Sequence, residues 1–199
     1  MRSIISNCLL AVICLTAASC VSNKPAQYYT ISPPPGAINP GRPDGLVIVV
    51  ADIPTPASLQ DGRIRYRIEP NQVGAYEYHR WTERPGTMVR NSLVRALRAS
   101  GKYQRVLESG SGTAGDYLVM GKLYDFSEVD RGTIQTKVSL QLLLIDKKTG
   151  RHVWDHLFEH EEPVAAKNVK DVVASLDRNL QQVVGDAAGQ IDAFVSARR

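Results

Sequence analysis

Three histidines recur at intervals of four residues: His152, His156 and His160. On a helix this spacing would bring the imidazole rings to one face, where they could bind zinc. The segment follows a turn sequence, "DKKTGR", and is therefore expected to be a strand, in which four residues span about 13 Å. Zinc needs each ligand nitrogen within about 2.1 Å. We therefore expect no metal site, and histidines on the strand face that carries Trp154 and Phe158.

A second chemical candidate is the string "GSGTAG" at 110–115, which matches the G-x-G-x-x-G pattern of nucleotide sites. In such a site the glycines open a helix whose amino terminus faces the pyrophosphate. Here the residues that follow, "DYLVMGKL", are typical of a strand, so we interpret the string as a connector. No serine or carboxylate pair stands in a recognised catalytic setting. The sequence therefore nominates no catalytic residue and no cofactor, and we do not expect an enzyme.

Basic and aromatic side chains in two neighbouring segments form a candidate partner surface: Arg65, Tyr66, Arg67, Tyr76, Tyr78 and Trp81. Arginine and aromatic side chains are enriched at the energetically important positions of protein interfaces. The alternative is that the tyrosines and Trp81 cover a sheet edge and the start of a helix. The sequence leaves both interpretations open.

All three cysteines, Cys8, Cys14 and Cys20, lie within the first 20 residues, so none is available for a disulfide or a thiol nucleophile later in the chain. Residues 1–19 have the order of a secretory signal peptide, with Arg2 first, then an apolar centre and small residues at the close. The unbroken apolar stretch has eight residues, whereas a membrane-spanning helix needs about 20. We therefore expect residues 1–19 to be a cleaved signal peptide.

The small residues Ala17, Ala18 and Ser19, directly before Cys20, resemble the lipobox of bacterial lipoproteins. This resemblance implies cleavage between Ser19 and Cys20, and a triacylated Cys20 as the new first residue. A triacylated cysteine would anchor the protein stably in a membrane, because stable anchoring needs about two lipid signals. Ordinary secretory cleavage after "AAS" is the alternative. In enteric-type bacteria an Asp after the cysteine is the usual inner-membrane retention signal, so Val21 in that place favours the outer membrane.

Removal of residues 1–19 would leave 180 of the 199 residues and lower the formal net charge from +4 to +3, because Arg2 is the only ionisable side chain removed. A weak positive excess spread along the chain is not the footprint of a nucleic-acid-binding protein. We expect residues 20–45 to be a lipidated amino terminus with a short strand at 27–32 and a Pro/Gly-rich linker. Residues 46–199 have the length of one domain.

Apolar alternation predicts the strands of this domain, which are expected at 46–53, 62–69, 75–81, 116–129, 133–146 and 151–161. In the second strand, the alternation directs three side chains inward: Ile64, Tyr66 and Ile68. It gives the opposite face a basic character, through Arg63, Arg65 and Arg67.

Two amphipathic helices are predicted, one at 86–100 between Pro85 and Gly101, and one that begins after Asn168 with Asp171 completing its cap. In each, apolar residues recur at intervals of three and four. The order of strands, helix, strands and helix, with hairpins dominating, predicts an α+β fold. We expect a mainly antiparallel sheet with both helices packed on one face.

Four stretches of the chain resemble the PqiC-like family of ABC-type transport auxiliary lipoproteins: "AASC", "YYTI", "IPTPASLQDGRIRYRIEP" and "YEYHRWTERPGTMVRNSLVRAL". The resemblance rests on their order and spacing. It implies a non-enzymatic, periplasm-facing lipoprotein that works with an MCE-domain protein and an inner-membrane ABC transporter in moving phospholipid or other lipid between membranes. The ATPase and the lipid channel would belong to these partners, and homo-oligomer formation stays open.

Two alternatives come from other functional classes. One is a scaffolding or assembly lipoprotein of another envelope machine, such as a secretion or pilus system. The other is a lipoprotein hydrolase, which would need a deep pocket holding Ser or Asp against a histidine.

Overall fold

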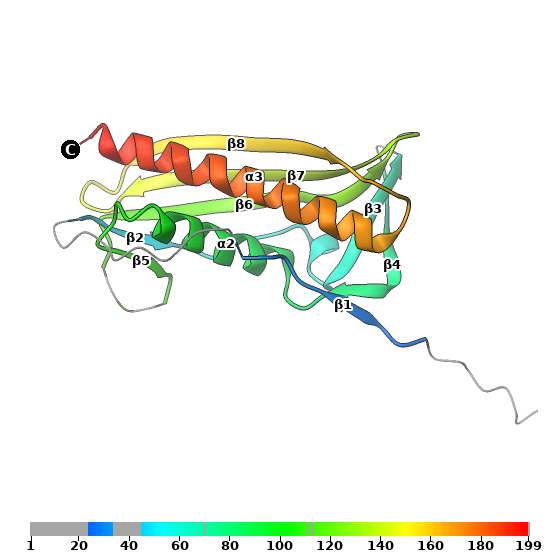
Figure 1. Cartoon of the computed structure of the whole chain (residues 1–199). Coiled ribbons are helices and arrows are strands. Elements are labelled where there is room, and N and C mark those ends of the chain that lie inside the picture. The colour runs from blue at the N-terminus through cyan, green and yellow to red at the C-terminus, as the bar shows by residue number, and fades with distance from the viewer. Residues whose placement is uncertain (1–23, 34–44, 70, 111, 113, 199) are drawn as a thin grey trace, which may run out of the picture.

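The sheet is built around three long strands that run antiparallel in consecutive hairpins (Figure 1). In the computed structural model, which describes residues 24–33, 45–69, 71–110, 112 and 114–198, they are β6 (Tyr117–Asp130), β7 (Ile134–Asp146) and β8 (His152–Pro163). The turn between β7 and β8 lies where it was predicted. Gly150 in this turn has a φ of 69°, which glycine adopts without a Cβ clash. The histidine segment is therefore a strand.

Two shorter strands share one edge of β6. The first residues of β6 pair with β2 (Val47–Val50), its last residues pair with β3 (Arg63–Glu69), and both pairings are parallel. The sheet is completed by β5 (Arg105–Glu108) parallel to β2, by β4 (Gln72–Trp81) antiparallel to β3, and by β1 (Gln27–Tyr29) parallel to β4. A short 3-10 turn, η1 (Ala57–Leu59), lies between β2 and β3.

The predicted α+β class is confirmed, and the longest ladders, β6–β7 and β7–β8, are antiparallel. The sheet as a whole is mixed, with four parallel pairs that the sequence pattern did not predict. Hairpin signals report only strands that are neighbours in the chain, whereas a parallel pair needs a longer connection. The four-residue strand β5 was also missed, because it is too short to show a clear alternation.

Both helices pack on one face of the sheet, as predicted (Figure 1). The first, α2 (Pro85–Ala99), buries Val89, Leu93 and Leu97 completely. The second, α3 (Val169–Ser196), begins at the predicted cap, where the Asn168 side chain accepts a hydrogen bond from the Asp171 backbone N–H at 3.0 Å.

The core lies between these helices and the inner face of the sheet. On β7, where alternation predicted a strand, every second side chain from Thr136 to Leu144 is fully buried. Three α3 side chains, Leu176, Leu180 and Ile191, are likewise fully buried. The predicted signal peptide, Cys20 and most of the Pro/Gly-rich linker lie outside the described residues.

Candidate interaction surface

The arginines of the candidate surface lie on one side of β3 and contact acidic side chains. Arg65 forms an ion pair with Asp61 at 2.7 Å, and Arg67 pairs with Asp125 at 3.3 Å. Asp61 also pairs with Arg63 at 2.7 Å. The predicted basic face exists, but its charge is largely compensated by neighbouring carboxylates.

Two tyrosines of the candidate surface form a cluster with a buried carboxyl group. The rings of Tyr66 and Tyr76 meet edge to face at a centroid distance of 5.2 Å, and Tyr76 Oη donates to Glu128 Oε2 at 2.5 Å. A Cβ at Gly74 would lie 2.3 Å from Tyr66 Cζ, so only glycine lets this ring lie over β4. Burial raises the pKa of Glu128. The pKa of Tyr76 is also raised, mainly by burial and in addition by its hydrogen bond to Glu128.

These residues do not form one surface. In register with β6, Tyr66 stands opposite Glu128 and Arg65 opposite Ser127, so the tyrosine and the arginine point to opposite faces of the sheet. Trp81 is wrong as a surface residue, because it is only 4% exposed and packs against Phe126 at a centroid distance of 5.3 Å. Trp81 is thus part of the core.

The end of β3 also departs from the prediction. Ile68, which was expected to point inward, is 52% exposed, and Val73 just beyond the turn is 44% exposed. The alternation continues to the end of β3, but the exposure of these two side chains shows that the face is not covered there. Periodicity assigns a side chain to a face, whereas the extent of the covering layer decides whether that face is buried.

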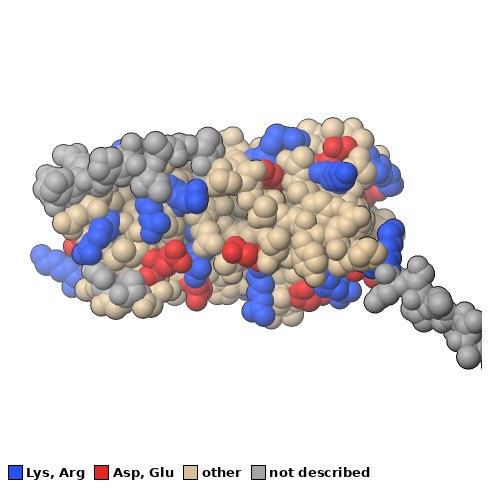
Figure 2. Space-filling view, turned by 60° about the horizontal axis from the view of Figure 1, so that its bottom comes forward, with Lys and Arg blue, Asp and Glu red and all other residues tan. Residues whose placement is uncertain are grey.

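Tyr78 is partly exposed and lies in a different group, close to the amino-terminal end of the described chain. The Lys24 ammonium lies 5.6 Å from the centroid of the Tyr78 ring. Tyr28 is 64% exposed, and Arg80 is its register partner across β1 and β4. We call Lys24, Tyr28, Tyr78 and Arg80 the tether patch. Figure 2 shows basic side chains beside the point where the amino-terminal trace leaves the domain, and mixed charge over the rest of the visible face.

The sheet face opposite the helices carries further exposed apolar side chains, among them Met120, Tyr124 and Leu157 at 40%, 44% and 48% exposure. Met120 stands beside Leu143 of β7 in the ladder. The sequence pattern predicts these strands but does not assign their outer faces. Their signal was the run of apolar residues in "LQLLLI", where both alternating sets are hydrophobic.

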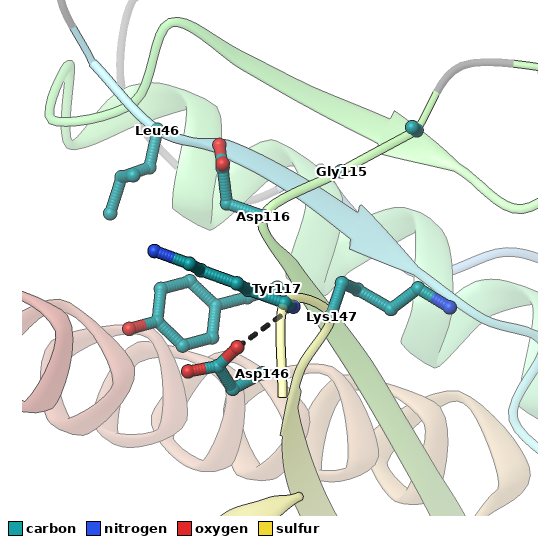
Figure 3. Close-up of a pocket in the computed structure, with 8 residues that line it drawn as sticks. Leu46, Gly115, Asp116, Tyr117, Asp146 and Lys147 are labelled. Carbon is teal, nitrogen blue, oxygen red and sulfur yellow. Dashed lines mark hydrogen bonds between the residues drawn. The ribbon is translucent and has the colours of Figure 1, made fainter. Parts of the chain in front are cut away.

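A hollow of about 520 Å³ lies beside the β7–β8 turn, lined by residues that include Leu46, Asp116, Tyr117 and Asp146 (Figure 3). Its carboxylates bond to the backbone. Asp116 accepts from the Val47 N–H at 2.7 Å, and Asp146 accepts from the Lys148 N–H at 2.9 Å. These bonds fix the start of β2 and the turn, so the hollow is explained by the fold.

The histidines and serines that could support chemistry have structural partners. His160 Nδ1 lies 3.2 Å from Asn179 Oδ1 of α3, and the His156 ring meets Phe158 at a centroid distance of 4.5 Å. This confirms the shared face predicted for His156 and Phe158. The Ser175 hydroxyl lies 2.8 Å from that of Thr136. No group of three or more His, Cys, Asp or Glu that could hold a metal ion occurs among the described residues.

The "GSGTAG" string leads into β6 rather than into a helix. Its interpretation as a connector is therefore confirmed, since the nucleotide motif requires a helix amino terminus. In the described part of the chain, neither helix combines the length and apolar character that a membrane-spanning helix requires.

Comparison with solved structures shows that this fold recurs. The chain is similar to a Xanthomonas campestris protein of the DUF330 family, with 21% identity and a TM-score of 0.75, covering 87% of this chain and 100% of that one. It is also similar to an uncharacterised protein at 17% identity and a TM-score of 0.66, covering 84% and 99%. A hypothetical protein of Chlamydia trachomatis has 12% identity and a TM-score of 0.51, covering 77% and 99%. At these identities the likeness establishes the fold.

A search of the curated proteins finds no match to this chain. The family model described as the ABC-type transport auxiliary lipoprotein component matches residues 29–188. That range extends from β1 into α3 and includes every strand described above except the first two residues of β1. The chain therefore belongs to the family of ABC-type transport auxiliary lipoproteins, which are auxiliary transport components.

Proposed function

We propose that the mature protein is anchored in the outer membrane through an acylated Cys20 and faces the periplasm. There it serves as the auxiliary component of an ABC and MCE-type system that moves phospholipid or other lipid between membranes. The observation that carries this proposal is the family match over residues 29–188. The lipobox-like "AASC" ends at Cys20, a short distance before the matched range begins at residue 29.

The docking of β1 supports a position close to the membrane. Gln27–Tyr29 pairs with β4, and the Tyr29 carbonyl accepts from the Thr82 N–H at 2.8 Å. If Cys20 is acylated, the free tether is only residues 21–26, which reach about 20 Å at full extension. Anchoring raises the effective concentration of the domain beside its partners, and this is the physical contribution that we assign to it.

The role we propose is non-enzymatic. The fully buried polar residues Thr136, Ser175 and Asn179 bond to one another or to backbone between α3 and the sheet. They hold the helix in place, so the surfaces of the domain, rather than a reactive centre, would carry its function.

The anchor is tested by replacing Cys20. We expect Cys20→Ala to release the protein from membranes into the periplasm with its fold intact, because every contact described here begins at Lys24 or later. Cys14→Ala, in the predicted signal peptide, is the matched control and should leave fractionation unchanged. A Cys20→Ala protein that has lost its leader and still sediments with membranes would contradict the anchor.

The partners are tested by purifying the tagged, membrane-extracted protein and identifying its companions and bound lipid by mass spectrometry. An MCE-domain protein with an ABC permease and ATPase supports the proposal. Components of a secretion or pilus machine, without transport subunits, would instead support the scaffolding alternative.

A further inference from the structure

We infer that the tether patch (Lys24, Tyr28, Tyr78 and Arg80) is a docking surface for a bilayer that carries anionic headgroups. This inference rests on the proposed anchor, since the anchor would bring the patch to the membrane. It adds that the domain itself contacts the lipid surface at a defined place and therefore has a preferred orientation.

The register of β1 and β4 separates an inner set of side chains from an outer set. Tyr29 stands opposite Trp81, and Tyr28 stands opposite Arg80. Register partners in neighbouring strands share a face, and successive residues alternate between faces. Because Trp81 packs in the core, Tyr29 points inward and Tyr28 points to the opposite side with Arg80.

The inner set fixes the position of β1. The Tyr29 hydroxyl lies 2.9 Å from His79 Nδ1, and their rings are 5.7 Å apart. Further along, the Ser32 N–H donates to Asp177 Oδ1 at 3.2 Å, and the Ser32 carbonyl accepts from Gln181 at 2.7 Å. Tyr28 is therefore presented on a strand that pairs with β4 and is fixed at its carboxyl end.

The chain length places this outer set within reach of the headgroups. Lys24 follows Cys20 by four residues, which extend at most about 14 Å. The headgroup region on each side of the hydrocarbon core is about 5–7 Å thick. An acylated Cys20 at the membrane surface would therefore keep the Lys24 backbone within about 14 Å of that surface, which is about twice the thickness of the headgroup region.

The chemistry of the outer set matches that surface. Tyrosines are enriched where membranes meet water, and basic side chains are attracted to anionic lipids. Tyr28 is exposed over 64% of its surface, and the Lys24 ammonium lies 5.6 Å from the centroid of the Tyr78 ring. A cation and aromatic rings are thus gathered on one side of β1 and β4.

Acidic side chains nearby do not cancel this arrangement. Asp61 is occupied by Arg63 and Arg65 at 2.7 Å each. Glu77 accepts a hydrogen bond from Tyr78 and keeps its negative charge, so the two cations Lys24 and Arg80 still outnumber it beside the proposed membrane surface.

The test uses the chain that begins at Val21, so that it works whether or not Cys20 is acylated. This chain lacks cysteine, and Ala26→Cys therefore provides a single site for an environment-sensitive fluorophore at an exposed position directly before β1. We expect its emission to shift to the blue on titration with phosphatidylglycerol-containing vesicles, much less with phosphatidylcholine vesicles, and less at high salt. In this background Lys24→Gln should lower the partition constant about fivefold, and Tyr28→Ser should lower it severalfold.

Three controls make the result specific. A fluorophore at Lys148→Cys, in the β7–β8 turn at the other end of the molecule (Figure 1), should show no shift. In the Ala26-labelled chain, Lys148→Gln and Tyr124→Ser should leave partitioning unchanged. Equal response to neutral and anionic vesicles, no response to either, or equal losses in the control variants would overturn the inference. The anchor is judged separately, by the mass of the native amino-terminal residue.

Discussion

The two faces of the sheet are made by the same strands and differ sharply in what covers them. On β7, Leu142 is fully buried under the helices, while its neighbour Leu143 is on the opposite face and only partly covered. On that opposite face Met120 and Leu157 are 40% and 48% exposed. The helix-covered face thus holds the fold together, and the open face offers apolar and charged side chains that the fold does not require.

The largest expected effect tests this difference directly. Leu142→Ala should lower the free energy of unfolding by about 2–5 kcal/mol, because it leaves a cavity under the helices. Leu143→Ala removes the same atoms from the open face and should cost less than about 1 kcal/mol. Denaturant unfolding of both variants measures the contrast, and equal losses would show that the open face is covered in solution.

A smaller effect is expected where α3 is joined to the covered face by polar bonds. The buried Asn179 amide donates to the Thr136 carbonyl at 2.9 Å and to the His160 carbonyl at 3.1 Å. Asn179→Ala should lower the free energy of unfolding by about 1–3 kcal/mol, since it leaves two carbonyls without this donor. Gln182→Ala, on the exposed side of the same helix, should change it by less than about 0.5 kcal/mol. Thermal unfolding that ranks the two variants equally would contradict this role.

The smallest effect concerns Glu128, where burial raises the pKa of the carboxyl group above its ordinary value near 4.5. The folded protein therefore binds the proton more tightly, and its stability falls as pH rises from the unfolded pKa through the higher folded pKa. Glu128→Gln keeps an acceptor for Tyr76 and removes this titration. We expect a flatter stability curve above pH 4.5 and a change at pH 7 below about 1 kcal/mol. If the stability of the variant keeps the wild-type pH dependence, a group other than Glu128 is responsible for it.

Local patterns in the sequence predict most of the elements. The Asn168 cap, the Gly150 turn and the alternating set on β7 all stand where the pattern put them, because each depends on residues close together in the chain. Parallel pairing of β2 and β3 with β6 depends on contacts between distant segments. No local spacing encodes such contacts, so the mixed character of the sheet could not be predicted.

The candidate surface was predictable only in part. Residue type identified Arg65, Tyr66 and Trp81 as interface formers. The alternation of the strands and burial instead place Arg65 on the open face, Tyr66 beside Tyr76 and Glu128, and Trp81 in the core. Tyr28 and Lys24 were not singled out, because their importance follows from the docking of β1 onto β4. Their signal was the aromatic "YYTI" close behind the cysteine, read as a strand rather than as a surface.

The six residues from Gln27 to Ser32 attach the amino terminus to the domain, since three of them pair with β4 and Ser32 bonds to α3. If Cys20 carries the proposed lipid, the connection between lipid and domain is residues 21–26, which reach about 20 Å at full extension. Loss of these contacts would add residues 27–32 to the connection, which would then reach about 40 Å. A few hydrogen bonds would thus decide the greatest distance between the domain and the proposed anchor.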